Sequence, residues 1–229
     1  MEQQTTSQEK AINFSSITST AIQVITKPVS FFQQMPKTGG FVQPLVFMAV
    51  MGVVSALVGL ILAILGLGSG GVGMAFAAII LTPIIIAIFG FVVAAVVFVI
   101  WKIMGSSEGY ETAYRCVAYA TAIVPLTTIL GIIPYIGAIL GLVWTTYLLV
   151  LASSEVHGIA AKKAWIGFGA VAAVLAIVSL STEYAGRKMM QGLEGWQEQA
   201  ESMDVEEMTP EDAGKMVGDF LKGFSEEGE

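Results

Sequence analysis

Five long apolar runs constrain this chain more than any other feature of its sequence. They cover approximately residues 44–66, 80–101, 113–133, 135–152 and 163–181. A helix needs roughly 20 apolar residues to cross about 30 Å of hydrocarbon at about 1.5 Å per residue. The composition agrees, because 55% of the residues are hydrophobic, 13% are charged and the mean hydropathy is +0.76. We therefore expect an all-α, polytopic membrane protein whose five transmembrane helices form a bundle.

Two of these runs leave their helix boundaries open. The second run begins near Met74, and Thr82 followed by Pro83 has the pattern of a helix cap and first residue. Either the helix starts at Pro83 after a separate turn, or the whole run is one tilted, kinked helix. The fourth run is the shortest, and the tight connection GIIPYIG before it predicts a hairpin of two spans.

Hydropathy and charge together divide the chain into three parts. These are an N-terminal segment (residues 1–43), the membrane domain (residues 44–181) and an acidic tail (residues 182–229). Residues 1–182 have seven Lys or Arg and five acidic residues, whereas residues 183–229 have four and thirteen. Such a tail repels phosphates, and basic stripes with interleaved aromatics are missing, so we expect no nucleic-acid binding. In the tail, residues 210–224 have the pattern of a short amphipathic helix.

The N-terminal segment is also amphipathic. Its apolar positions are Ile17, Ala21, Val24, Phe31 and Phe32. They either lie in the lipid headgroup region or pack on the span bundle.

Positive charges predict the orientation in the membrane, because Lys and Arg prefer short cytoplasmic loops. Lys10, Lys27 and Lys37 precede the first span, Lys102 and Arg115 follow the second, and Lys162 and Lys163 follow the fourth. The other two loops have no Lys or Arg. The pattern favours an inward N-terminus and an outward C-terminus, although Arg187 and Lys188 after the last span oppose it. We expect a bacterial inner membrane location.

Motifs for catalysis, cofactors and metals are weak. GLGSGG places Gly66, Gly68 and Gly71 in a dinucleotide-like spacing, but that motif works only inside a βαβ unit. Ser69 and the single histidine, His157, fall on opposite sides of the bilayer, and a nucleophile must touch its base. A metal site at Glu155 and His157 lacks further ligands. We therefore expect no catalytic residues, no cofactor and no metal.

Small residues form a stripe along the first span. Its members are Gly52, Ala56, Gly59, Ala63 and Gly66. Small side chains allow helices to approach closely inside a membrane. The stripe predicts tight packing within one chain, and a homo-oligomer is the alternative.

Ionisable residues gather at the ends of the spans, and we find none at mid-membrane. His157 has the position of a residue that meets the last carbonyls of the fourth span, and Gly158 then ends the helix. Glu155 is expected to pair with Lys162, Lys163 or Arg115, and Glu111 with Arg115 has the spacing of a surface ion pair. Arg115, Glu155, His157 and Lys163 together form a candidate cytoplasmic corner that binds a partner or anchors the structure.

Four stretches of the sequence carry a family resemblance: KPVSFFQQMP, GSSEGYETAYRCVAYATA, IPYIGAILGLVWTTYLLVLASSEVHGI and KKAW. In these stretches, over about residues 27–181, the chain resembles the Yip domain family of Ypt/Rab-interacting membrane proteins in its prokaryotic form. It implies a small helical membrane protein without a known catalytic centre. Eukaryotic relatives are associated with vesicle traffic and Rab GTPases, and that role is not carried over because the cytoplasmic segment here is short.

Two function classes remain open from the sequence. The first is a non-enzymatic membrane protein that organises partner proteins or membrane shape through its cytoplasmic loops. The second is a small-solute permease or channel, which Thr residues within the spans would permit. A solid bundle favours the first class, and a water-filled path favours the second.

Overall fold

The computed structural model describes residues 14–67 and 71–201, together with the single residues 214 and 218. These residues form α1 (Phe14–Thr26), α2 (Pro28–Gln34), α3 (Val42–Ile64), α4 (Gly71–Ile103), α5 (Tyr110–Ala120), the 3₁₀ helix η1 (Thr121–Ile123), α6 (Val124–Leu130), α7 (Ile136–Glu155) and α8 (Ala161–Glu201). The chain divides into two compact units, Met1–Leu180 and Ser181–Glu229. Apart from residues 214 and 218, the predicted tail helix 210–224 lies outside the described residues.

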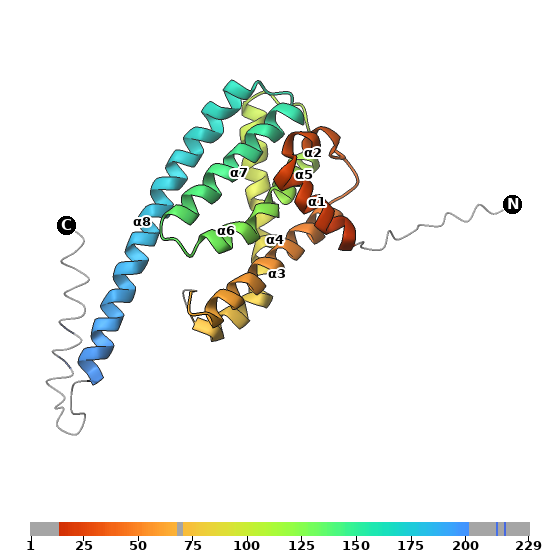
Figure 1. Ribbon diagram of the computed structural model, residues 1–229. Helices are drawn as coiled ribbons and strands as arrows, with labels where there is room; N and C mark the ends of the chain where they lie inside the picture. Colours follow the sequence, from red (N-terminus) through yellow and green to blue (C-terminus); the bar gives the residue numbers. More distant parts are fainter. Residues whose placement is uncertain (1–13, 68–70, 202–213, 215–217, 219–229) are drawn as a thin grey trace. The chain divides into compact units, whose positions relative to one another are not determined.

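In the part of the chain that the structure describes, five helical segments are long and apolar enough to cross a membrane. They are Val42–Ile64, Gly71–Ile103, Tyr110–Leu130, Ile136–Glu155 and Ala161–Met189. Across the described part of the chain the regular structure is helical throughout. The predicted fold class, an all-α membrane bundle with five spans, is confirmed, and Figure 1 shows how these helices follow one another.

The second span is a single helix of 33 residues that contains Pro83 in its interior. The prediction of a helix start at Pro83 is therefore wrong, and the alternative of one long helix holds. At about 1.5 Å per residue such a helix is about 50 Å long, which exceeds the hydrocarbon thickness. Proline is tolerated inside membrane helices where a neighbouring helix covers the disturbed backbone. Here Gly52 of α3 provides that cover, because a Cβ at Gly52 would lie 3.0 Å from the Pro83 Cα.

The third span is interrupted, since α5 and α6 are joined by the 3₁₀ turn η1. Pro125 lies in the first turn of α6, where its missing N–H is not needed. After α6 the chain turns at Tyr135, which has φ 63°, and Gly137 of α7 lies against the Leu130 carbonyl. The hairpin predicted from GIIPYIG is thus formed by α6 and α7, which pack on each other.

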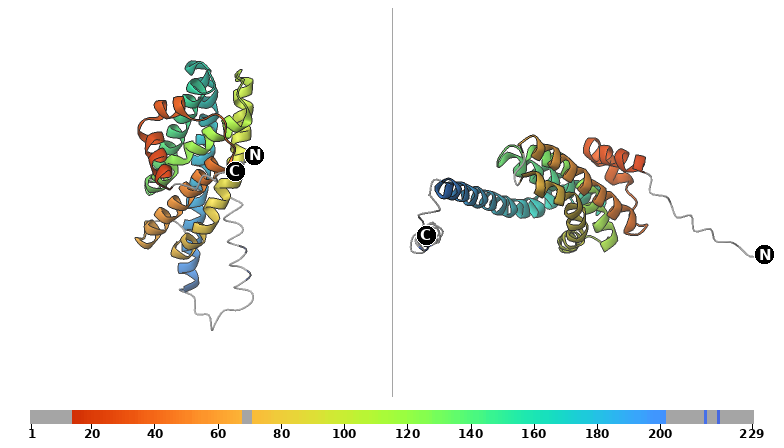
Figure 2. Two further views of the ribbon diagram at one scale, coloured as in Figure 1. Left: turned by 90° about the vertical axis from the view of Figure 1, so that its right-hand side faces the viewer. Right: turned by 90° about the horizontal axis from the view of Figure 1, so that it is seen from below.

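The two N-terminal helices pack on the bundle. Ile17 and Val24 of α1 and Phe32 of α2 are buried, and the Phe31 ring lies 5.2 Å from the Tyr119 ring of α5. Helix α1 contacts α5 and η1, and α2 contacts α7 (Figures 1 and 2). Of the two alternatives for the amphipathic segment, packing on the bundle is the one observed.

Large buried side chains fill the bundle at the end that these N-terminal helices cover. Trp101 of α4, Tyr114 of α5 and Leu148 of α7 have no solvent exposure. The start of α8 joins this core, because its Phe168 ring lies 5.8 Å from the Trp101 ring. The candidate site is built on this packed end.

Candidate functional site

The loop between α2 and α3, residues 36–40, is fastened to α5 by a pair of charged side chains. The Gly40 N–H donates to Glu111 Oε1 at 2.7 Å, and the Gly40 carbonyl accepts from Arg115 Nη1 at 2.8 Å. Arg115 Nε also donates to the Pro36 carbonyl at 2.7 Å. Gly39 and Gly40 have φ values of 126° and 80°, which glycine adopts without strain. The backbone N–H and the backbone carbonyl of Gly40 are therefore both bonded to side chains of α5.

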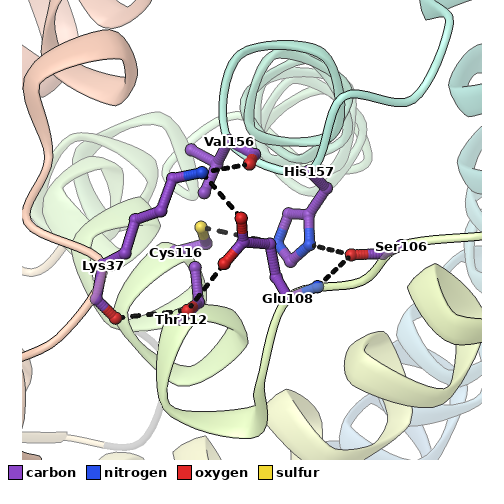
Figure 3. A network of polar contacts seen from close by, with 7 residues as sticks. All are labelled: Lys37, Ser106, Glu108, Thr112, Cys116, Val156 and His157. Atoms are coloured by element: carbon purple, nitrogen blue, oxygen red, sulfur yellow. Dashed lines mark hydrogen bonds and ion pairs between the residues drawn. The ribbon is translucent and has the colours of Figure 1, made fainter.

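Lys37 links the same loop to two further parts of the chain. Its Nζ lies 2.7 Å from Glu108 Oε1 and donates to the Val156 carbonyl at 3.0 Å (Figure 3). The Lys37 carbonyl accepts from Thr112 Oγ1 at 3.2 Å. The hydrogen bond from Lys37 lowers the pKa of the Glu108 carboxyl, so this group stays ionised to a lower pH than usual. Lys37 thus joins the α4–α5 connection to the end of α7.

His157 fills the space between the α4–α5 connection and α5. Its ring stacks on the Trp101 indole with centroids 3.8 Å apart, and Nδ1 shares a hydrogen bond of 2.7 Å with Ser106 Oγ. Nε2 lies 3.9 Å from Cys116 Sγ (Figure 3). Burial lowers the pKa of His157 to about 4, because a charged imidazole would lose its hydration there. The ring is therefore neutral at neutral pH.

The end of α7 confirms one expectation about His157 and corrects another. Gly158 has φ 65° and follows the helix, and the His157 backbone N–H donates to the Ala152 carbonyl at 3.2 Å. The His157 side chain, however, does not meet the carbonyls of its own helix. It bonds to Ser106 because the packed Trp101 ring turns it toward the α4–α5 connection.

Glu155 and Lys163 bond to neighbours that differ from those expected. Glu155 Oε2 accepts from Gln33 Nε2 of α2 at 2.8 Å, and Lys163 Nζ donates to the Met104 carbonyl at 2.8 Å. Among the described residues Glu155 forms no ion pair with Lys162, Lys163 or Arg115, so that prediction is wrong. The physical reason is that α2 packs on the end of α7, which brings the Gln33 amide within hydrogen-bond distance of the Glu155 carboxylate.

Arg115 corrects one further expectation. The pair with Glu111 exists at 3.8 Å, but the Arg115 side chain is 1% exposed, so this is not a surface pair. Arg115 and His157 lie near span ends, as expected, and both are buried. Their side chains form hydrogen bonds with loop carbonyls and with Ser106, and these bonds offset the free-energy cost of burying polar groups.

The four residues of the predicted corner are therefore not one cluster. Arg115 holds the 36–40 loop, Glu155 holds α2, and His157 and Lys163 hold the α4–α5 connection. Each joins its own segment to a part of the chain that is distant in sequence, at the same packed end. We call this set of contacts, with Lys37 and Glu108, the clasp.

Sequence reasoning missed Lys37, Ser106 and Glu108 as partners in the clasp. Their partners lie between 51 and 119 residues away in the chain, which no local pattern records. One signal was available for Arg115. Its neighbours in the sequence of α5 are mostly small or apolar, and in the structure Ala113, Cys116 and Ala118 are fully buried. Such a helix is enclosed by other helices.

The surroundings of the small-residue stripe differ from one end of α3 to the other. Gly52 and Ala56 are buried, with Gly52 against Pro83, whereas a Cβ at Gly59 would lie 4.0 Å from Thr128 Cγ2 of α6. Ala56, Gly59 and Ala63 line a pocket. Gly66 follows the end of α3 with φ 72°.

The chemistry available at the clasp is that of hydrogen bonding and ion pairing. No group of three or more His, Cys, Asp or Glu side chains close enough to hold a metal occurs in the described ranges. Cys116 Sγ lies beside His157 Nε2, but Cys116 is completely buried, so the pair offers no approach for a substrate. The clasp joins helices and loops to one another.

An integral membrane protein with five apolar spans and an N-terminal helix pair packed on the bundle is the class that this fold defines. The sequence profile of the Yip1 domain matches residues 22–182, and the chain belongs to the Yip1 domain family. The match includes the whole clasp and excludes most of the acidic tail. Searches of the curated proteins and of the solved structures found no significant match.

Proposed function

We propose that this protein is a non-enzymatic membrane scaffold of the Yip type, which binds a partner protein through the surface of α1 and α2. The clasp carries this proposal. The buried Arg115 and the Lys37–Glu108 ion pair fix the segment that leads from α2 to α3, and Glu155 holds α2 through Gln33. A rigid recognition surface loses less conformational entropy on binding than a mobile one.

The exposed side of this helix pair has a groove of about 430 Å³. Its lining combines polar and apolar side chains, and includes Gln23, Lys27, Ser30, Phe31, Gln34 and Met35. Lys27 and Gln34 are exposed, whereas Met35 is buried at the base. Mixed surfaces of this kind suit a protein segment that brings an apolar side chain with polar or acidic neighbours.

The proposal includes a location. Lys10, Lys27 and Lys37 precede the first span, and Lys102, Arg115, Lys162 and Lys163 flank the loops at the clasp. The positive-inside rule then supports a clasp on the cytoplasmic face and an N-terminus inside. Together with the prokaryotic character of the resemblance, this supports a bacterial inner membrane as the site of action. A permease role receives less support, because Trp101, Tyr114 and Leu148 fill the bundle beside the clasp.

Proximity labelling in the native host tests the proposal. The labelling enzyme is fused before Met1, and labelled proteins are compared between the wild type and the double variant Lys27→Glu, Gln34→Glu. Both positions are exposed, so the variant should fold normally while a bound partner is lost. The matched control is Lys162→Glu, an exposed lysine outside the groove. The proposal fails if the double variant retains every partner that the control retains.

A further inference from the structure

A pocket of about 330 Å³ lies within the membrane domain between α3, α4 and α6. Its walls include Ala56, Gly59 and Ala63 of α3, Ala78 of α4 and Thr128 of α6. The clasp does not use any of these residues. The volume falls within the range of about 300–1,000 Å³ that is usual for small-molecule sites.

The surroundings of the pocket indicate where its occupant comes from. All these residues lie in segments that are apolar and long enough to cross a membrane. Exposed apolar side chains, among them Ile61, Phe76 and Ile80, flank the pocket along α3 and α4. In a bilayer such side chains contact lipid chains. The bilayer is therefore the source of molecules that can enter the pocket.

Ser55 supplies a second and independent observation. It lines the pocket, the residue is 5% exposed, and its Oγ has no hydrogen-bond partner within the residues that the structure describes. Several other hydroxyls of the spans differ: Thr128 Oγ1 and Ser154 Oγ, for example, donate to carbonyls of their own helices at 3.0 Å and 3.2 Å. A buried hydroxyl without a partner is unfavourable in hydrocarbon. It thus favours a ligand that brings an acceptor.

We infer that this pocket holds one hydrocarbon chain of a membrane amphiphile, and that the chain carries a carbonyl oxygen that accepts a hydrogen bond from Ser55. A carbonyl is favoured over a hydroxyl because it needs no acceptor of its own. Ser55 lies nine residues before Ile64, the last residue of α3, or about 14 Å along the helix axis. The carbonyl must therefore lie deep in the bilayer, far from a headgroup at that end of α3.

Native mass spectrometry of the full chain in detergent tests this inference with two probes. One is stearic acid, and the other is oxostearic acid with its ketone near mid-chain. The wild type should bind oxostearic acid more tightly, by about fivefold to tenfold, which corresponds to one hydrogen bond of about 1 kcal/mol. Ser55→Ala should bind the two acids equally. Ala63→Leu, which fills the pocket from a partly exposed position, should weaken the binding of both.

Ser154→Ala is the control, because Ser154 lies on α7 and its hydroxyl is already bonded within the helix. It should keep the wild-type preference. Circular dichroism and gel filtration verify that each variant is folded, and Ser55→Cys replaces Ser55→Ala if the latter does not fold. The inference is overturned if the wild type does not prefer the ketone acid, or if a variant at residue 55 keeps that preference. It is also overturned if Ala63→Leu binds both acids as tightly as the wild type does. It stands independently of the partner role of α1 and α2.

Discussion

At the scale of single residues, buried polar groups decide which loops are fixed. Arg115 and His157 are enclosed by apolar and small side chains, and each keeps its polar atoms bonded to a segment distant in sequence. Removing such a group leaves its partners buried without hydrogen bonds. Stability is therefore expected to depend on these residues more than on any exposed charge.

Arg115→Lys tests the strength of the clasp. Lysine keeps the positive charge but cannot donate to the Pro36 and Gly40 carbonyls in the planar geometry of a guanidinium. We expect a loss of roughly 2–4 kcal/mol in the free energy of unfolding, measured in detergent by thermal or chemical denaturation. The matched control is Arg187→Lys, whose side chain is 46% exposed and which should change stability by less than about 0.5 kcal/mol. Equal losses in the two variants would contradict this role of Arg115.

The buried histidine predicts a dependence of stability on pH. The pKa of His157 is about 4 in the folded protein and about 6.5 when unfolded, so only the unfolded chain binds a proton between these values. The free energy of unfolding should therefore fall by up to about 1.4 kcal/mol per unit as the pH drops from about 6.5 to about 4. The lowered pKa of Glu108 acts in the same direction at the acidic end.

Melting temperatures recorded from pH 4 to pH 8 measure this effect. The variant His157→Gln is neutral throughout and should show a flatter profile between pH 4 and pH 6.5, although it is less stable than the wild type at pH 7. A slope that His157→Gln leaves unchanged would assign the pH dependence to other groups.

At the scale of elements, a close backbone approach joins α3 to α4. Gly52→Ala should destabilise the protein by about 1–3 kcal/mol, because the new Cβ would lie 3.0 Å from the Pro83 Cα, an atom that cannot swing aside. Gly73→Ala in α4 is the matched control, since a Cβ there meets nothing within 4 Å and alanine favours a helix. Denaturation in detergent compares the two. A Gly52→Ala variant as stable as Gly73→Ala would mean that α3 and α4 separate without loss.

At the scale of the whole molecule, topology decides which partners each end can reach. The inward N-terminus that we propose from the positive charges, combined with five crossings, predicts a C-terminus outside. Alkaline phosphatase fused after Glu229 should therefore be active in a bacterial host, and green fluorescent protein at the same point should be dark. The same two reporters fused before Met1 should give the opposite results. A fluorescent C-terminal fusion would show that one of the five segments does not cross.

The sequence by itself determined the helical membrane class, the five spans, the α6–α7 hairpin and the helix end at Gly158. These features depend on local quantities, namely the length and hydropathy of a run and the backbone freedom of glycine. The family resemblance also followed from the sequence, and the profile match over residues 22–182 confirmed it. The continuity of α4 through Pro83 could not be decided locally, because the glycine that covers this proline lies on another helix.

The tertiary structure alone decided the partners of the polar residues. Arg115, Glu155, His157 and Lys163 were correctly placed near span ends, yet of their side-chain partners only Glu111, which pairs with Arg115, was foreseen. A side chain bonds to whatever donor or acceptor the packing of distant helices brings within about 3 Å. For Glu155 that group is Gln33, 122 residues earlier in the chain, rather than a lysine seven or eight residues later. Helix formation follows from the neighbours in sequence, whereas hydrogen-bond partners follow from how the helices pack.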